Sequence, residues 1–219
     1  ANTEHELRWN SVEFRDGFDG ERGGLGILRA GGGINQSMVL MKYGVHGLGH
    51  GHFDKLHISF FDQGREVLHD YGFGRWINIE PKFGGRYLPE NDSYAKQTIA
   101  HNTLVVDQQS QNAGNRRAAD KMWAKRHFFD NTNPATQVMS ARADDYYDGV
   151  QLQRTVLLLD REEFEYPILV DVIRARSEED HVYDYPFHHK GQLISTNLKY
   201  EASTASMSAL GEEAGYEHV

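Results

Sequence analysis

The sequence of 219 residues predicts an all-β fold, an antiparallel β-sandwich. Three observations predict it: a series of strand-like apolar segments, turn residues between them, and many strand-forming aromatic residues beside 22 glycines. With 39% hydrophobic residues, the chain is long enough to bury a substantial core. We expect residues 1–24 to be a connector and residues 25–219 to form the β-sandwich domain.

The strands are expected in a series that begins at Leu25. LGILRA and NQSMVLMKYG flank Gly31–Gly33 and predict a first hairpin. KLHISFF and REVLHDYG flank the loop Asp62–Gly64 and predict a second, with Gly64 free to take a positive φ. Further strands are expected at HNTLVVD, QVMSARA, VQLQRTVLLLD and YPILVDVIRAR.

Two other segments complete the series. Residues 72–100 predict a long loop, and long loops in compact domains are often functional. RRAADKMWAKR, residues 116–126, is the one helix-like stretch of the sequence.

Composition narrows the classes of function. The chain has no cysteine, so any metal must be held by His, Asp or Glu. The formal charge of −9 and the lack of a basic run argue against nucleic acid as a partner. The longest apolar runs are too short to cross a bilayer, so we expect no membrane span. No signal peptide opens the sequence, so an exported parent would carry that segment outside this chain.

Histidines and aspartates gather in GHGHFDKLHISFFDQGREVLHDYG, residues 49–72. His50 and His52 lie on one side of an extended backbone, and Asp70 and His101 follow at the end of one expected strand and the start of another. His52, Asp70 and His101 are candidate ligands of a zinc ion, which accepts His and carboxylate donors in tetrahedral geometry. The alternative is that these are ordinary polar side chains, since a chain with 12 histidines contains some His-x-His pairs by chance.

Hairpin geometry gives this site partial support. With Asp62–Gly64 as the loop, Asp70 is expected opposite Leu56, on the same face as position 52. The four residues between positions 52 and 56 span ~13 Å of strand, so the chain must turn near Phe53 and Asp54 to bring His52 back. The spacing permits a metal site without requiring one.

The predicted loop concentrates cationic and phenolic side chains immediately before His101. These are Arg75, Lys82, Arg86, Tyr87, Tyr94 and Lys96. Such a cluster suits an anionic substrate, and nearby positive charge lowers the pKa of a phenol so that its phenolate can act as a general base. The alternative is a solvated loop whose aromatic side chains pack onto the sandwich.

Three blocks of the sequence, in this order, resemble the heparinase II/III-like polysaccharide lyases. They are GHGHFDKLHISFFDQGREVLHDYG, GGRYLPENDSYAKQTIAHNTLVVD and YDYPFHHKGQL. They are most similar to the oligoalginate lyases of polysaccharide lyase family 17. The resemblance runs from about residue 25 to the end and implies that an (α/α) toroid precedes this β-sheet portion, with the active site between the two.

The resemblance also implies roles for particular residues in the β-elimination of a uronic-acid polymer. His52, Asp70 and His101 match the ligands of a structural zinc ion. Tyr87 matches the catalytic tyrosine, with Tyr94 as a second candidate that would otherwise bind substrate. The further substrate contacts are His50, which would neutralise or orient the substrate carboxylate, Arg75 and His188.

The partners and the location follow from the same resemblance. We expect an anionic oligosaccharide as substrate and the toroid as the missing partner domain. We also expect a periplasmic or secreted bacterial protein, and a homodimer is compatible with this interpretation. Because the toroid supplies further catalytic residues, the chain by itself is expected to be weakly active or inactive. The competing functions are a non-catalytic β-sandwich that binds acidic glycans, and a cupin-like metal enzyme that uses His50, His52 and His101.

Overall fold

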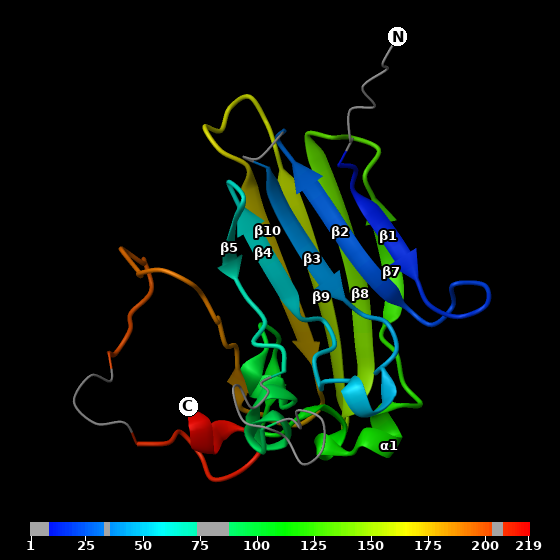
Figure 1. The fold of residues 1–219 in the computed structure, drawn as a ribbon, viewed down its shortest axis with the longest axis vertical. Helices are drawn as coiled ribbons and strands as arrows, with labels where there is room; N and C mark the ends of the chain where they lie inside the picture. The colour runs from blue at the N-terminus through cyan, green and yellow to red at the C-terminus, as the bar shows by residue number, and fades with distance from the viewer. Residues whose placement is uncertain (1–8, 33–35, 74–87, 203–207) are drawn as a thin grey trace, which may run out of the picture.

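Two antiparallel sheets packed face to face form the body of the computed structural model (Figure 1). The structure describes residues 9–32, 36–73, 88–202 and 208–219. One sheet has five strands in the order β1-β2-β3-β4-β5, and the other has four in the order β10-β9-β8-β7. The strands of the first sheet are β1 (Val12–Arg15), β2 (Gly24–Ala30), β3 (Ser37–Lys42), β4 (Ile58–Asp62) and β5 (Arg65–Leu68). Those of the second are β7 (Lys125–Asp130), β8 (Thr136–Tyr147), β9 (Val150–Leu159) and β10 (Ile168–Arg176).

Short helices and one small strand pair gather at the lower end of the sandwich in Figure 1. The strand pair joins β6 (Val105–Val106) to β11 (Tyr183–Asp184). The helical elements are η2 (Leu48–His50), η3 (Asn91–Ala95), η4 (Thr98–Ala100), η5 (Gln111–Gly114), α1 (Arg116–Ala119) and η6 (Tyr216–His218). Among the described residues, no helix is long and apolar enough to cross a membrane.

The core lies between the inner faces of the two sheets. Alternate residues of β9 face it, namely Val150, Leu152, Arg154, Val156 and Leu158, all buried. Residues of β3 and β4 meet them from the other sheet and belong to the same apolar cluster. Because alternate side chains of a strand point to opposite faces, the remaining positions of β9 face away from the core.

The predicted all-β sandwich is confirmed, and all the sheet pairings between described strands are antiparallel. The helix predicted over residues 116–126 is wrong beyond Ala119. Asn115 caps one helical turn by accepting a hydrogen bond from the Ala118 N–H, and from Lys125 the chain pairs with β8 instead. The pairing partner, and not helix propensity, decides the conformation of this segment. Residues 12–15, placed in the expected connector, form the edge strand β1.

The second hairpin exists, but the register expected for it is wrong. Its turn is the two residues Gln63 and Gly64, both with positive φ (47° and 70°), as a type I′ turn requires. Asp62 pairs with Arg65, and a bulge then shifts the register so that Phe60 pairs with Leu68. The predicted pairing of positions 56 and 70 therefore does not form.

Candidate metal centre and its surroundings

Four side chains converge at the lower end of the sandwich. Each of His52, Asp54, Asp70 and His101 offers a metal-ligating atom, and these atoms lie within 4.8 Å of one another. We call these four residues the ligand cluster. His52 and Asp54 follow η2, Asp70 lies two residues beyond β5, and His101 directly follows η4. Three of the four are buried, His101 completely. The structure thus brings together the three predicted ligands, although they come from different parts of the chain.

The backbone around His52 makes the turn that the sequence analysis required. Leu56 takes a left-handed conformation with φ of 66°, although it is not glycine. The Leu56 N–H donates to the Lys42 carbonyl (2.8 Å), and the His57 N–H donates to the Asp54 carbonyl (3.0 Å). Gly51 permits a close approach, because a Cβ there would lie 2.1 Å from the His46 carbonyl oxygen. These constraints fold residues 51–57 back so that His52 reaches His101.

Inside the ligand cluster, Asp70 and His101 are direct neighbours. His101 Nδ1 lies 3.0 Å from Asp70 Oδ2, and the rings of His52 and His101 are 5.1 Å apart. The other oxygen of Asp70 accepts a hydrogen bond from the Gly72 N–H (2.8 Å). Burial acts to raise the pKa of Asp70, but the hydrogen bond with His101 outweighs it, so the pKa falls below its usual range. Asp70 is therefore a carboxylate at neutral pH.

His52 is held neutral by its surroundings. Burial, with the neighbouring His101, lowers the pKa of His52 to about 4. A neutral imidazole has a nitrogen lone pair, which is what a metal ligand requires. The ring of Phe73 packs edge-on against His52 at 4.6 Å and limits the access of water to it.

Asp54 is the member of the ligand cluster that the sequence analysis did not name as a ligand. Its two oxygens accept from Lys42 Nζ (2.5 Å) and Lys55 Nζ (3.1 Å), and Lys55 is itself buried. Burial acts to raise the pKa of Asp54, but the two lysines lower it well below the usual range. Because both oxygens already have cationic partners, Asp54 is better placed to support the bend than to donate to an ion.

The residues present fit a zinc ion. His101 Nε2 is buried without a hydrogen-bond partner, and burying an unpaired polar atom costs free energy unless a ligand satisfies it. Zinc bonds of ~2.0–2.2 Å place the ligand atoms of a tetrahedron ~3.3 Å apart, and the ligand atoms of the cluster lie within 4.8 Å of one another. His52, Asp70 and His101 supply two nitrogens and one carboxylate, a donor set that zinc accepts. That an ion binds there stays a prediction.

Two residues behind the ligand cluster were missed by the sequence analysis. His57 accepts a hydrogen bond from the Asn102 N–H at Nδ1 (3.0 Å), so its proton is on Nε2, which faces Ser59 Oγ (3.0 Å) and Asp70 (3.6 Å). Burial lowers the pKa of His57 to about 3, so this tautomer stays neutral. Asn102 bonds the Ile58 and His69 carbonyls through its amide nitrogen. Both residues hold the strands around the ligand cluster in place.

Arg154 connects the second sheet to the same region. Its guanidinium is fully buried, is paired with both oxygens of Asp171 (2.8 and 2.6 Å), and bonds the hydroxyl of Tyr185. It also donates to the carbonyls of Leu56 (2.7 Å) and Asn102 (2.5 Å). These two carbonyls belong to the segments that carry His52 and His101. A signal was present in the sequence: Arg154 is the one charged residue among the alternate, otherwise apolar positions of VQLQRTVLLL.

The remaining predicted site residues have different surroundings. Arg75 and Tyr87 lie outside the described residues. His50 ends η2 and packs edge-on against Phe73 at 6.3 Å, and it is not a member of the ligand cluster. The His50, His52 and His101 triad of a cupin-like enzyme is therefore not what the described residues bring together.

Tyr94 and His188 lie in a row of rings beside the ligand cluster. The ring of Tyr71 lies tilted against that of Tyr94 at 5.5 Å and packs edge-on against His188 at 5.1 Å. His188 Nε2 donates to the Ile99 carbonyl (2.7 Å), and its backbone N–H donates to Asn102 Oδ1 (2.6 Å). Burial raises the pKa of Tyr94, with a contribution from Tyr71. The idea that loop cations lower the phenol pKa is therefore wrong for Tyr94.

Comparisons with known proteins agree with this arrangement. The family described as heparinase II/III-like, C-terminal, matches residues 14–216. The chain is 41% identical over its whole length to an alginate lyase of Stenotrophomonas maltophilia (strain K279a). It is 40% identical over 96% of its length to an exo-oligoalginate lyase of Saccharophagus degradans. It spans only 29% and 28% of these two relatives.

Solved structures show the same fold. A heparan sulfate lyase, HepC from Pedobacter heparinus, aligns with a TM-score of 0.55 at 21% identity, over 79% of this chain and 23% of that one. A heparinase III aligns with a TM-score of 0.54 at 17% identity, over 76% of this chain and 22% of that one. The family match, the two sheets and the order of the three sequence blocks lead to one conclusion: this chain belongs to the heparinase II/III-like C-terminal family.

Proposed function

We propose that the chain is the β-sandwich part of a polysaccharide lyase that cleaves oligoalginate or a related uronic-acid polymer by β-elimination. The two curated relatives, named alginate lyase and exo-oligoalginate lyase, support this substrate class. Because the chain covers less than a third of either relative, the activity is proposed for a complete protein in which a helical toroid precedes this part. A periplasmic or secreted location fits a polymer that is degraded outside the cytoplasm.

One structural observation carries the proposal. Phe73, the last described residue before the segment with Arg75 and Tyr87, packs against both His52 and His50. Lys96 Nζ lies 5.5 Å from the centre of the same ring. Phe73, which precedes the segment proposed to carry the base, therefore lies against a member of the ligand cluster.

The reaction assigns each group a task. A base removes the proton on C5, which is α to the carboxylate; the electron pair forms the C4–C5 double bond, and the bond between C4 and O4 breaks as a general acid gives its proton to O4. We assign the base to Tyr87 and the neutralisation of the substrate carboxylate to His50, because this proton becomes acidic only when the developing charge is stabilised. Arg75, Tyr94 and His188 are proposed to bind substrate.

The proposed metal has a structural task. A zinc ion held by His52, Asp70 and His101 would fix the bend at residues 51–57 to the segment after η4. His50 is two residues from His52, so this bend also determines where His50 lies. The same rigidity would hold Phe73, which packs against His52.

The test uses the complete polypeptide and a defined oligoalginate. Lyase activity is followed by the ultraviolet absorbance of the unsaturated product. Replacing Tyr87 by Phe is expected to lower kcat ~10²–10⁴-fold, the usual contribution of a general base. The matched control is Tyr200→Phe, an exposed tyrosine far along the chain, which is expected to change nothing. Unchanged turnover in Tyr87→Phe would remove the assignment of the base, and binding without any product would favour a non-catalytic glycan-binding domain.

A further inference from the structure

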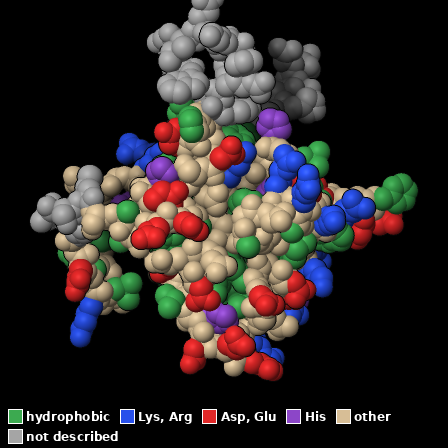
Figure 2. Space-filling model, turned by 90° about the horizontal axis from the view of Figure 1, so that it is seen from below, with side chains coloured by type: hydrophobic (Ala, Val, Ile, Leu, Met, Phe, Trp, Pro, Cys, Tyr) green, Lys and Arg blue, Asp and Glu red, His purple; other side chains and the backbone are tan. Residues whose placement is uncertain are grey.

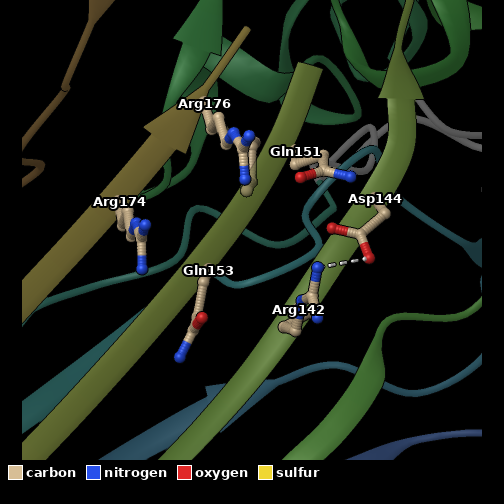
Figure 3. Close-up of a pocket in the computed structure, with 7 residues that line it drawn as sticks. Arg142, Asp144, Gln151, Gln153, Arg174 and Arg176 are labelled. Carbon is tan, nitrogen blue, oxygen red and sulfur yellow. Dashed lines mark ion pairs between the residues drawn. The ribbon is translucent and has the colours of Figure 1, made fainter. Parts of the chain in front are cut away.

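The outward face of the second sheet carries a set of long polar side chains that the proposed reaction does not use. They come from three adjacent strands and line one depression of about 220 Å³ (Figure 3). We call them the arginine stripe: Arg142, Asp144, Gln151, Gln153, Arg174 and Arg176. Of their sequence neighbours, Ala143 and Leu152 belong to the core cluster and Ala175 packs against it, so the stripe faces away from the core.

The strand register orders the arginine stripe into two rows. Gln153 of β9 pairs with Arg174 of β10 on one side and with Arg142 of β8 on the other. Gln151 pairs in the same way with Arg176 and Asp144. Neighbouring strands are ~4.8 Å apart and alternate residues of a strand ~6.6 Å apart, so polar groups recur at short intervals across the depression.

The charge of the arginine stripe is opposite to that of the chain. It has three guanidinium groups and one carboxylate, whereas the chain as a whole has a formal charge of −9. Figure 2 shows Asp and Glu side chains scattered over the lower face of the molecule. Asp144 pairs with Arg142 at 3.2 Å. Within the described part of the chain, no carboxylate pairs with Arg174 or Arg176, and both are exposed. Two cationic groups are thus available to an anion.

The two glutamines add neutral hydrogen-bonding groups between the arginines. Gln153 Nε2 contacts His127 Nδ1 and donates to Ser140 Oγ (both 3.1 Å), which fixes the side chain on the sheet. A guanidinium group binds a carboxylate through two parallel hydrogen bonds, and amides bind hydroxyl groups. The combination matches a sugar that has both a carboxylate and hydroxyls. The depression is smaller than the ~300–1,000 Å³ of a drug-sized site, which suits one sugar of a longer chain.

The arginine stripe and the ligand cluster lie on opposite sides of β9. Gln153 faces outward, while the adjacent Arg154 faces inward and bonds the carbonyl of Asn102, next to His101. A sugar on the stripe would therefore lie outside the proposed catalytic centre.

We propose that the arginine stripe is an accessory subsite for a carboxylated glycan, in which Arg174 and Arg176 bind uronate carboxylates. The identity of the sugar rests on the proposed function, whereas the preference for a carboxylated over a neutral chain rests on the stripe itself. Such a subsite would hold a long polymer on the protein without taking part in bond cleavage.

The experiment measures the binding of the complete polypeptide to alginate, and to neutral mannan, by affinity electrophoresis. Replacing both cations (Arg174→Gln with Arg176→Gln) is expected to weaken the retardation by alginate about tenfold, given up to ~1 kcal/mol for each exposed ion pair. The matched control removes two exposed arginines elsewhere, Arg65→Gln with Arg117→Gln, and is expected to retain the affinity within about twofold. Mannan should retard none of the proteins.

Kinetics separate this proposal from the proposed function. With a short trisaccharide as substrate, kcat is expected to be unchanged in the stripe variant, while KM for the polymer rises. Equal losses in the two double variants, or no loss in the stripe variant, would overturn the subsite. A drop in melting temperature without any loss of alginate binding would also overturn it and would indicate that the rest of the parent chain packs there. If no unsaturated product forms but retardation depends on the stripe, the subsite stands and the lyase function fails.

Discussion

The ligand cluster and the arginine stripe lie on opposite sides of β9, and their side chains are held in opposite ways. In the ligand cluster, Asp54, Asp70 and His101 are held by hydrogen bonds and ion pairs, and His52 by packing against two rings. The stripe is solvated, with two cations that no described carboxylate neutralises. Burial makes charges strong and geometry decisive, whereas water weakens exposed charges. The two sites should therefore respond to different perturbations.

The largest expected effect comes from removing one proposed ligand. His101→Ala should abolish stoichiometric zinc, because the loss of a direct ligand exceeds the ~10–100-fold cost of losing a supporting residue. Zinc is measured by elemental analysis after dialysis of the complete protein. His189→Ala, an exposed histidine outside the ligand cluster, is the control and should keep its zinc. If wild-type protein and both variants contain no zinc, the ligand cluster is not a metal site and the orphan His101 nitrogen needs another explanation.

Strand placement could be predicted from the sequence, because the alternation of apolar residues specifies which face of each strand is buried. The segments KLHISFF, REVLHDYG and VQLQRTVLLLD all contain observed strands. The register of the second hairpin could not be predicted, because the bulge at Phe60 adds a residue that leaves no pattern in the sequence. This register shift cannot be read from the residue types, yet it determines where Asp70 lies.

The candidate site shows the same division. Spacing together with the family resemblance found His52, Asp70 and His101. Asp54 and His57 were missed, although they lie in the same stretch. Their roles depend on the left-handed backbone conformation of Leu56, which a residue other than glycine rarely adopts. Arg154 was missed for another reason: a buried arginine is unusual, and its four partners come from distant parts of the chain. Its inward position, however, follows from the alternation in β9.

The next largest effect is on stability and tests the buried hydrogen-bond network of Arg154. Arg154→Met should lower the free energy of unfolding by ~3–5 kcal/mol, because Asp171 is left partly buried without its partner. Two carbonyls beside the ligand cluster lose their donor at the same time. Chemical denaturation gives the measurement.

Its control is the same substitution at an exposed ion pair. Arg161 pairs with Glu163 at 3.0 Å on the surface, so Arg161→Met should cost less than ~1 kcal/mol. A double variant, Arg154→Met with Asp171→Leu, should recover part of the loss, since both buried charges are then gone. Equal stabilities of Arg154→Met and Arg161→Met would show that the buried network does not hold the two sheets together.

The smallest effect is produced by salt, which should change alginate binding by the arginine stripe but not the zinc content of the ligand cluster. Raising NaCl from about 0.1 M to 1 M shortens the Debye length from ~10 Å to ~3 Å. Alginate binding through the exposed Arg174 and Arg176 should weaken severalfold, whereas the zinc content should not change, because three of the four members of the ligand cluster are buried. Affinity electrophoresis and elemental analysis on the same samples give both results. Alginate binding that is insensitive to salt would mean that hydroxyl contacts, and not the guanidinium groups, recognise the glycan. The two sites on either side of β9 would then differ in position but not in their response to salt.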